Sequence, residues 1–231
     1  MSALVVGDLS FELRTSDNRR TMQITVDRGG ELILAAPTGI KTEHLRDFVV
    51  EKRFWIYTKL AEKNRLQRIV PTKEYLDGEG FLHLGTSYRL RLVDEQLPPL
   101  KLIHGRFCLC RSEVAHGRLH FVRWYSTRAQ PWLWAKVQEY APRMEVRPSG
   151  VTVQDLGHRW GSCGKHARLY FHWMSILLPA RIAEYVVVHE LAHLHEPHHT
   201  PAFWRRIERA MPDFERRKTW LAENGMSVEG M

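Results

Sequence analysis

The segment Tyr185–Trp204, YVVVHELAHLHEPHHTPAFW, constrains this chain more than any other stretch. It contains the pattern His-Glu-x-x-His at His189, Glu190 and His193, and apolar residues surround the first pair. Residues four apart lie on one face of an α-helix, so both imidazoles can face the same ion. Glu190 is one step further round the helix and would lie beside that ion. The segment therefore predicts a helical metal site with a neighbouring general base.

The residues after this helix predict where a third ligand comes from. A residue that precedes proline is biased away from helical geometry, so Pro197 should end the helix near Leu194 or His195. Thr200 and Pro201 have the residue types of an N-cap and a first helical position, which predicts that a new helix starts there.

Three histidines in this stretch compete for the third position. His195 lies about 200° round the helix from His193 and should point away from the ion. His199 follows His193 by six residues, the interval found in the metzincin motif, and stands just before the predicted cap. We therefore predict His199 as the third ligand of a single Zn²⁺, with its neighbour His198 as the alternative.

Composition and charge set broad limits on the partners. The chain has 231 residues and a formal net charge of +8, which is compatible with nucleic acid or nucleotide partners. The Lys and Arg residues are scattered, and the densest run, Arg205–Lys218, has the spacing of a solvated helix face. No apolar run reaches the roughly 20 residues of a membrane span, and the N-terminus lacks the pattern of a signal peptide. We expect a cytoplasmic protein with no membrane partner; the oligomeric state is not indicated.

The three cysteines do not indicate a disulfide framework. Cys108 and Cys110 lie two apart in a predicted strand, where small buried residues are the favoured interpretation. Cys163 is the thiol that could close a zinc site as a fourth ligand. In that case the zinc would be purely structural, because structural sites are usually closed by four protein ligands.

Hydrophobic periodicity predicts an α+β fold with a β-rich N-terminal half. Residues 3–36 alternate apolar and polar side chains as a β-meander would, and a long helix is predicted over about 42–68. A second β run follows up to Val114. We place a domain boundary here, with a β-rich region over 1–115 and a second domain over 116–231.

The second domain is predicted to combine helices with a small sheet. Residues 119–144 have helical spacing, and Pro131 should kink that helix or start a second segment. A strand over 151–156, a glycine-bracketed turn at Arg159–Gly164 and a partner strand over 169–173 then precede the metal-binding helix. If the last of these strands lay at a sheet edge, it could accept an extended peptide.

Together these blocks resemble a known family. Several blocks are similar to the YgjP-like metallopeptidase domain: Arg159-Trp160-Gly161-Ser162-Cys163, the stretch Leu169–Pro179, and the block from Tyr185 to Leu194 with a histidine six residues after His193 and then Phe203-Trp204. That family is of the zincin type and is related to the SprT-like peptidases. The resemblance covers essentially the whole chain and implies a zincin-like helix–sheet core. It implies zinc ligands at His189, His193 and His199, with Glu190 as the catalytic base. One departure is His172, which stands where the family usually has asparagine before the strand tryptophan.

The leading hypothesis is therefore a zinc metallopeptidase that acts on a peptide or protein through a zinc-activated water. Substrate-binding or oxyanion-stabilising candidates are His172, Tyr170, Arg159 and His158. A metal-dependent nucleotide or phosphate hydrolase is the alternative enzyme, because Arg and Lys neutralise phosphate well. A non-catalytic, zinc-stabilised module that binds nucleic acid or protein is the third hypothesis.

Overall fold

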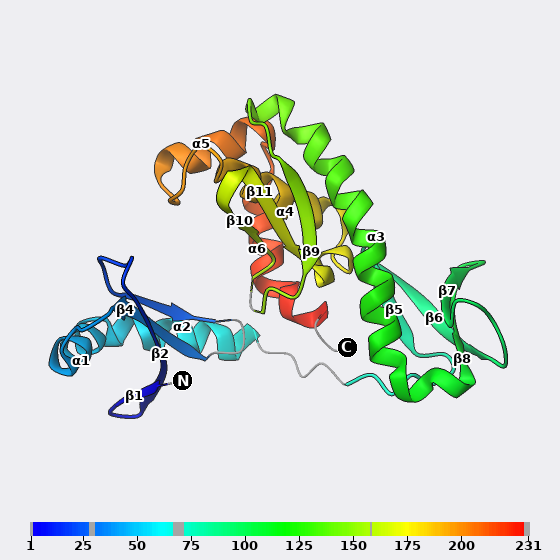
Figure 1. Ribbon diagram of the computed structural model, residues 1–231, viewed down its shortest axis with the longest axis horizontal. Helices are drawn as coiled ribbons and strands as arrows, with labels where there is room; N and C mark the ends of the chain where they lie inside the picture. The colour runs from blue at the N-terminus through cyan, green and yellow to red at the C-terminus, as the bar shows by residue number, and fades with distance from the viewer. Residues whose placement is uncertain (1, 28–30, 67–71, 158, 229–231) are drawn as a thin grey trace. The chain divides into compact units, whose positions relative to one another are not determined.

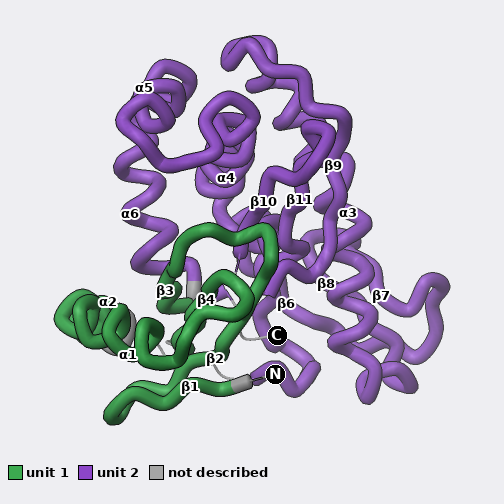
Figure 2. Tube along the Cα trace, turned by 60° about the vertical axis from the view of Figure 1, so that its left-hand side comes forward, with its two compact units in different colours: residues 1–68 green, residues 69–231 purple. Residues whose placement is uncertain are grey.

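The computed structural model describes residues 2–27, 31–66, 72–157 and 159–228. It shows an α+β fold with three sheets and, within these residues, six α-helices (Figure 1), so the predicted fold class is confirmed. None of the described helices is long and apolar enough to cross a membrane. The chain divides into two compact units, residues 1–68 and 69–231, which Figure 2 colours separately.

The first unit is one four-stranded sheet with two helices on it. Its strands are β1 (Ser2–Val6), β2 (Leu9–Ser16), β3 (Gln23–Val26) and β4 (Leu32–Pro37), and its helices are α1 (Thr42–Glu51) and α2 (Arg53–Leu66). Leu45, Val49 and Ile56 of the helices pack with Phe11 and Leu34 of the sheet in a separate core. Lys52, with φ −90° and ψ 2°, separates α1 from α2, so the single helix predicted over 42–68 is two helices. Residues 67 and 68 lie outside the described residues.

The strand order of this sheet is β1-β2-β4-β3, with β2 and β4 parallel. The predicted meander is therefore wrong. The hairpin of β3 and β4 folds back so that β4 lies between β2 and β3. Side-chain alternation is the same in both arrangements, because it records which face of a strand is buried and says nothing about its neighbour.

The second unit begins with another four-stranded sheet. Its strands are β5 (Gly80–His83), β6 (Thr86–Val93), β7 (Leu100–Ile103) and β8 (Arg106–Cys110). The order β5-β6-β8-β7 and the strand directions repeat those of the first sheet. The registers of the two sheets also match. In the first sheet, Glu12 pairs with Ala3 on one side and Ile33 on the other. In the second sheet, Arg89 has the equivalent position and pairs with Gly80 and Arg106.

Helix α3 (Gly117–Tyr140) joins this second sheet to the rest of the unit. Its N-terminal half covers the sheet, with the ring of Phe121 stacked 4.0 Å from that of Phe81, and Tyr125 donates a hydrogen bond to the Leu82 carbonyl. Further along, Gln130 bonds the backbone of β9 (Gly150–Gln154) at Val151 and Val153. Pro131 lies inside a single continuous helix.

Because the second sheet shares its core with α3, the boundary between the compact units differs from the predicted domain boundary. The sequence suggested a division after residue 115, whereas the compact units divide after residue 68. Phe81 and Phe107 of the second sheet belong to the same hydrophobic cluster as Leu133 of α3 and Val187 of α4 (Ala180–Ala192). The second sheet is therefore part of the unit that contains the His-Glu-x-x-His segment.

A three-stranded sheet and three helices complete the second unit. The sheet contains β9, β10 (Gly161–Cys163) and β11 (Arg168–His172) in the order β10-β11-β9. Helices α4, α5 (Pro201–Ala210) and α6 (Phe214–Asn224) follow. Short 3₁₀ helices occupy Arg111–His116, Pro142–Met144, Lys165–Ala167, Trp173–Ile176 and Gly225–Val228.

Candidate metal centre

Helix α4 carries the first part of the site on a buried element. Pro179 immediately precedes it, and the run Val186–Val188 is almost completely buried. His189 and Glu190 lie in its last turn, and His193 is the residue that caps its C-terminus. The helix therefore ends slightly before the predicted Leu194 or His195.

The chain then turns and returns a third imidazole to the same place. Helix α5 starts at Pro201, and the Thr200 hydroxyl accepts a hydrogen bond from the Phe203 amide at 3.4 Å, so the predicted cap is confirmed. His199 stands directly before this cap. The cap thus fixes the backbone that carries the third histidine.

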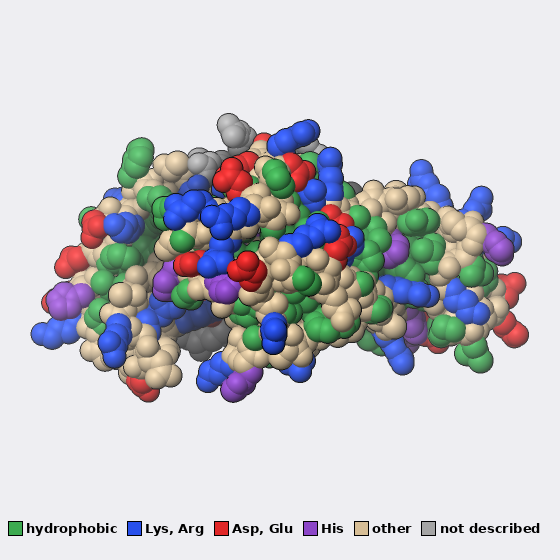
Figure 3. Space-filling model, turned by 90° about the horizontal axis from the view of Figure 1, so that it is seen from above, with side chains coloured by type: hydrophobic (Ala, Val, Ile, Leu, Met, Phe, Trp, Pro, Cys, Tyr) green, Lys and Arg blue, Asp and Glu red, His purple; other side chains and the backbone are tan. Residues whose placement is uncertain are grey.

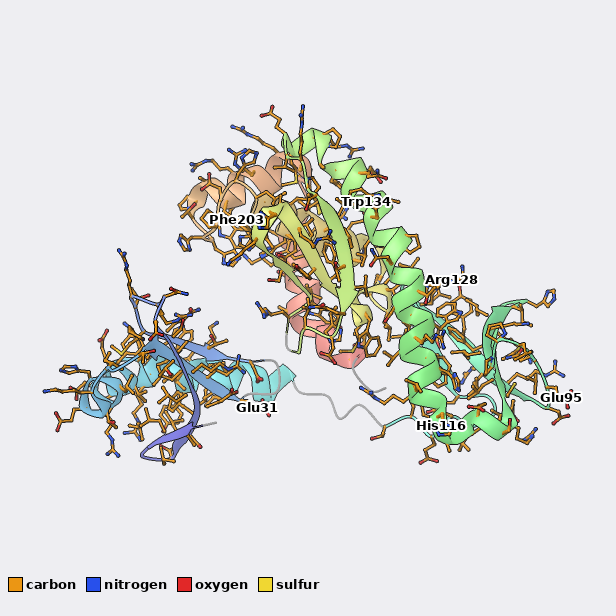
Figure 4. The ribbon with its side chains drawn as sticks, in the orientation of Figure 1. Glu31, Glu95, His116, Arg128, Trp134 and Phe203 are labelled. Carbon is orange, nitrogen blue, oxygen red and sulfur yellow. The ribbon has the colours of Figure 1, made fainter. Side chains whose placement is uncertain are left out.

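His189, His193 and His199 converge and form what we call the histidine cluster. Each offers a ligand atom within 4.8 Å of the others, and Nε2 of His199 lies 3.0 Å from Nε2 of His189. Phe203 of α5, labelled in Figure 4, is fully buried and contacts all three rings, with centroid distances of 4.7–5.0 Å. A single apolar side chain therefore supports the three imidazoles.

The chemistry of this donor set fits a metal ion. His193 donates Nδ1–H to the Glu196 carbonyl at 3.1 Å, which leaves its Nε2 with a free lone pair. Burial, with the neighbouring imidazoles and Lys218, lowers the pKa of His189 to about 3. Burial also lowers the pKa values of His193 and His199. All three rings are therefore favoured in the neutral form that binds metals.

An aromatic stack holds the third histidine from its outer side. The His199 ring lies parallel to that of Trp204, at an interplanar angle of 23°, and Trp204 stacks in turn on Phe214 of α6. The Lys218 ammonium lies 4.2 Å from the Trp204 ring centroid, within the range of a cation–π contact. Helix α6 thereby supports the loop that carries His199.

Glu190 lies beside the cluster in an almost closed environment. The residue is 5% exposed, and burial raises its pKa to about 8. The Arg159 charge and a hydrogen bond from the Cys163 backbone amide act in the opposite direction. A carboxyl group with a pKa near neutrality is suited to taking up and returning a proton.

These residues line one cleft of about 650 Å³. One wall is Arg159–Gly164, and Tyr185, Val186, Pro197 and Leu221 contribute further side chains. Strand β10, within the first wall, therefore runs past the histidine cluster and Glu190. The cleft can accommodate a substrate segment next to both.

A model of the YgjP-like metallopeptidase domain matches residues 20–224 of this sequence. The chain belongs to the YgjP-like metallopeptidase family. No curated protein shows significant similarity to it. Among solved structures, the crystal structure of the metallopeptidase zymogen of Pyrococcus abyssi abylysin is similar, with 22% identity and a TM-score of 0.34. That match covers 37% of this chain and 84% of the other.

In this YgjP-like domain the four candidates for substrate binding or oxyanion stabilisation lie in different places. Arg159 lines the cleft. Tyr170 and His172 are not among the described residues that line it. His172 is 2% exposed; its Nδ1 accepts a hydrogen bond from the Met174 amide, and its Nε2 lies 3.3 Å from a carboxylate oxygen of Asp155. His158 lies outside the described residues.

The other residues considered as metal ligands, Cys163, His195 and His198, lie outside the histidine cluster. Cys163 lines the cleft, but the group of described residues able to share a metal contains only the histidine cluster. His195 and His198 are exposed and do not belong to that group. The main feature that the sequence reasoning missed is Gly161, which lies against Glu190. In the sequence, the indication that Gly161 matters was its position in the glycine-bracketed block Arg159–Gly164.

The prediction that the strand before α4 could lie at a sheet edge is wrong. Strand β11 pairs with β10 on one side and with β9 on the other, so its backbone is already bonded along both edges. The edge strand beside the cleft is β10. Strand β10 is the edge because β9, which is not next to β11 in the sequence, pairs with β11 in parallel and covers its other side.

Proposed function

We propose that this chain is a zinc-dependent peptidase in which the histidine cluster holds one Zn²⁺ and Glu190 is the general base. The observation that carries the proposal is the convergence of three imidazoles beside a buried carboxyl group in an open cleft. Membership of a metallopeptidase family supports the same reaction class.

The roles of the metal ion and of Glu190 follow from the chemistry of the groups involved. A Zn²⁺ ion held by His189, His193 and His199 would supply the Lewis acidity needed to activate a water molecule and polarise the scissile carbonyl. Glu190 accepts the proton of the attacking water and later delivers it to the leaving amine. The Arg159 guanidinium favours the ionised form of this carboxyl and so opposes the effect of burial. Phe203 excludes water from beneath the imidazoles.

The cleft wall suggests how a peptide is held. Strand β10 is a sheet edge, and unpaired backbone groups of an edge can bond an extended chain. Arg159 lies in the same wall and is our candidate for binding the substrate or stabilising developing negative charge. For Tyr170 and His172 we propose supporting roles: the Tyr170 ring packs on Gly164, and His172 connects β11 to Asp155.

A purely structural zinc site is less well supported. Such sites usually have four protein ligands, and among the described residues the candidate group has three histidines. A buried carboxyl group next to the ligands would also be costly in a site without chemistry.

Metal analysis and turnover should be measured on the same preparations. The wild type is expected to contain one zinc per chain and to cleave unfolded protein until a chelator is added. Glu190→Gln should keep the zinc and lose cleavage, whereas His193→Ala should lose both. Phosphate release from nucleotides that depends on Glu190, without peptide cleavage, would replace the proposal with the phosphohydrolase. A sulfur ligand in X-ray absorption would replace it with the structural site.

A further inference from the structure

The face of the second sheet that does not contact α3 carries a group of cations. Apolar side chains such as Phe81, Leu90 and Phe107 point into the core, so the alternate residues point outward. Four outward positions are cationic, and we call them the basic face: Arg89 and Arg91 on β6, Lys101 on β7 and Arg106 on β8. The three arginines are exposed and line a shallow hollow together with Asp77 and Gly78.

The strand register brings these cations into neighbouring rows. Arg89 is directly opposite Arg106, while Arg91 and Lys101 flank Cys108 from its two sides. Like charges opposite one another in a sheet are destabilising. The arrangement therefore has a cost that the fold itself does not require.

Among the described residues, the carboxylates near the basic face have other partners, and Asp77 lines the hollow without forming an ion pair with its arginines. Within the described residues, none of the four cations of the basic face is in an ion pair with a carboxylate. Asp77 accepts a hydrogen bond from the Leu92 amide, and Arg89 donates one to the Gly78 carbonyl. Asp94 pairs with Arg111, and Glu95, labelled in Figure 4, lies in the loop beyond β6.

The first sheet provides an internal comparison, because it has the same topology and register. The positions equivalent to Arg89 and Arg91 are Glu12 and Arg14, which form an ion pair with a nitrogen–oxygen distance of 2.8 Å. Those equivalent to Lys101 and Arg106 are Gln23 and Ile33. The same face is thus neutral in one sheet and carries four positive charges in the other.

The net charge of the chain does not explain this local difference. On the surface shown in Figure 3, Lys and Arg side chains lie interspersed with Asp and Glu side chains. The basic face instead concentrates one sign over three adjacent strands. Such a concentration is the electrostatic signature of an anionic partner.

The side-chain types indicate phosphate groups. Three of the four cations are arginines, whose planar guanidinium groups bind phosphate in a bidentate manner. Arg89 and Arg91 lie two residues apart on a strand, which separates their Cα atoms by roughly 6.6 Å. A regularly repeating polyanion can contact such a row at several points. No aromatic side chain of the described residues projects from this face, so bases have no stacking platform there.

We propose that the basic face binds the phosphate backbone of nucleic acid without reading its sequence. The binding surface is formed by β6, β7 and β8 and is separate from the histidine cluster. It would hold nucleic acid on the same compact unit as the cleft. The proposal concerns binding and does not depend on the proposed peptidase activity.

The test is binding of a short, fluorescein-labelled duplex DNA of mixed sequence to the full chain, followed by anisotropy as a function of salt. The wild type should bind with log Kd rising linearly with log[salt]. Arg91→Gln/Arg106→Gln should weaken binding by about tenfold or more and lower the salt slope by about 2. Arg91→Lys/Arg106→Lys, which keeps the charge, should retain most of the slope.

A matched control removes the same charge from the first unit. Arg14→Gln/Arg20→Gln should leave both the affinity and the slope nearly unchanged, since neither residue is on the basic face. Equal losses in the two double variants would overturn the proposal, as would duplex binding that is insensitive to salt. Tighter binding to phosphatidylserine vesicles or to polyglutamate, abolished by the same arginine substitutions, would assign the face to a membrane or an acidic protein and also overturn it.

Discussion

Gly161 on β10 lies directly against the carboxyl group of Glu190 on α4. A Cβ atom at position 161 would be 2.6 Å from Cγ of Glu190 and 2.7 Å from its Oε1. Real Cβ atoms do not approach other heavy atoms so closely, so any larger residue at this position must displace the carboxyl group. The absence of a side chain at position 161 therefore fixes where the proposed general base can lie.

Gly161→Ala is accordingly expected to lower kcat by about one to two orders of magnitude, because a general base moved by about 1 Å is poorly placed for proton transfer. Zinc content should stay at the wild-type value, since the added methyl group points at Glu190. Gly150→Ala on β9 is the matched control: its Cβ would be in ordinary contact, 3.5 Å from the Arg168 side chain. Equal kcat losses in the two variants would show that the contact with Glu190 is not the cause.

The raised pKa of Glu190 predicts how the stability of the metal-free protein depends on pH. The pKa is 4.5 for the ordinary group and about 8 in the folded chain, so the folded state binds more protons between these values. The stability that Glu190 contributes in its neutral form is present below about pH 4.5 and is lost as the pH rises through 8.

Glu190→Gln removes this loss. In the presence of chelator, the free energy of unfolding of this variant should increase relative to that of the wild type from pH 5 to pH 9, by on the order of a few kcal/mol. Urea unfolding at both pH values measures the difference. A difference that stays constant across this range would contradict the assigned pKa.

The comparison of sequence and structure separates local from non-local information. Thr200 caps α5 as predicted, because capping depends on residues within one turn of each other. The parallel pairing of β2 with β4 was not predictable in this way, because strand alternation does not identify the partner strand. For the same reason β11 was a candidate edge, although β9 covers it. The contact of Gly161 with Glu190 depends on how a sheet edge packs on a helix.

Arg159 should influence the pH dependence of turnover through its charge. Its guanidinium group acts to lower the pKa of Glu190, and the proposed base must be ionised to accept a proton. Arg159→Ala should therefore shift the acidic limb of kcat/KM to higher pH, while Arg159→Lys should keep the limb near its wild-type position. An unchanged limb in the alanine variant would mean that the charge does not reach Glu190 during catalysis.

Trp204 should set how tightly the third histidine holds a metal. Its indole stacks on the His199 ring, while Phe214 and the Lys218 ammonium hold the indole itself. Without this support the His199 loop has more conformations to lose on binding. Loss of groups that orient a metal ligand typically costs about 10–100-fold in affinity. Trp204→Ala should weaken zinc binding by about this factor in a competition titration with a chromophoric chelator, and Trp204→Phe should recover most of it. If the two variants bound zinc equally well, stacking on His199 would have no part in organising the site.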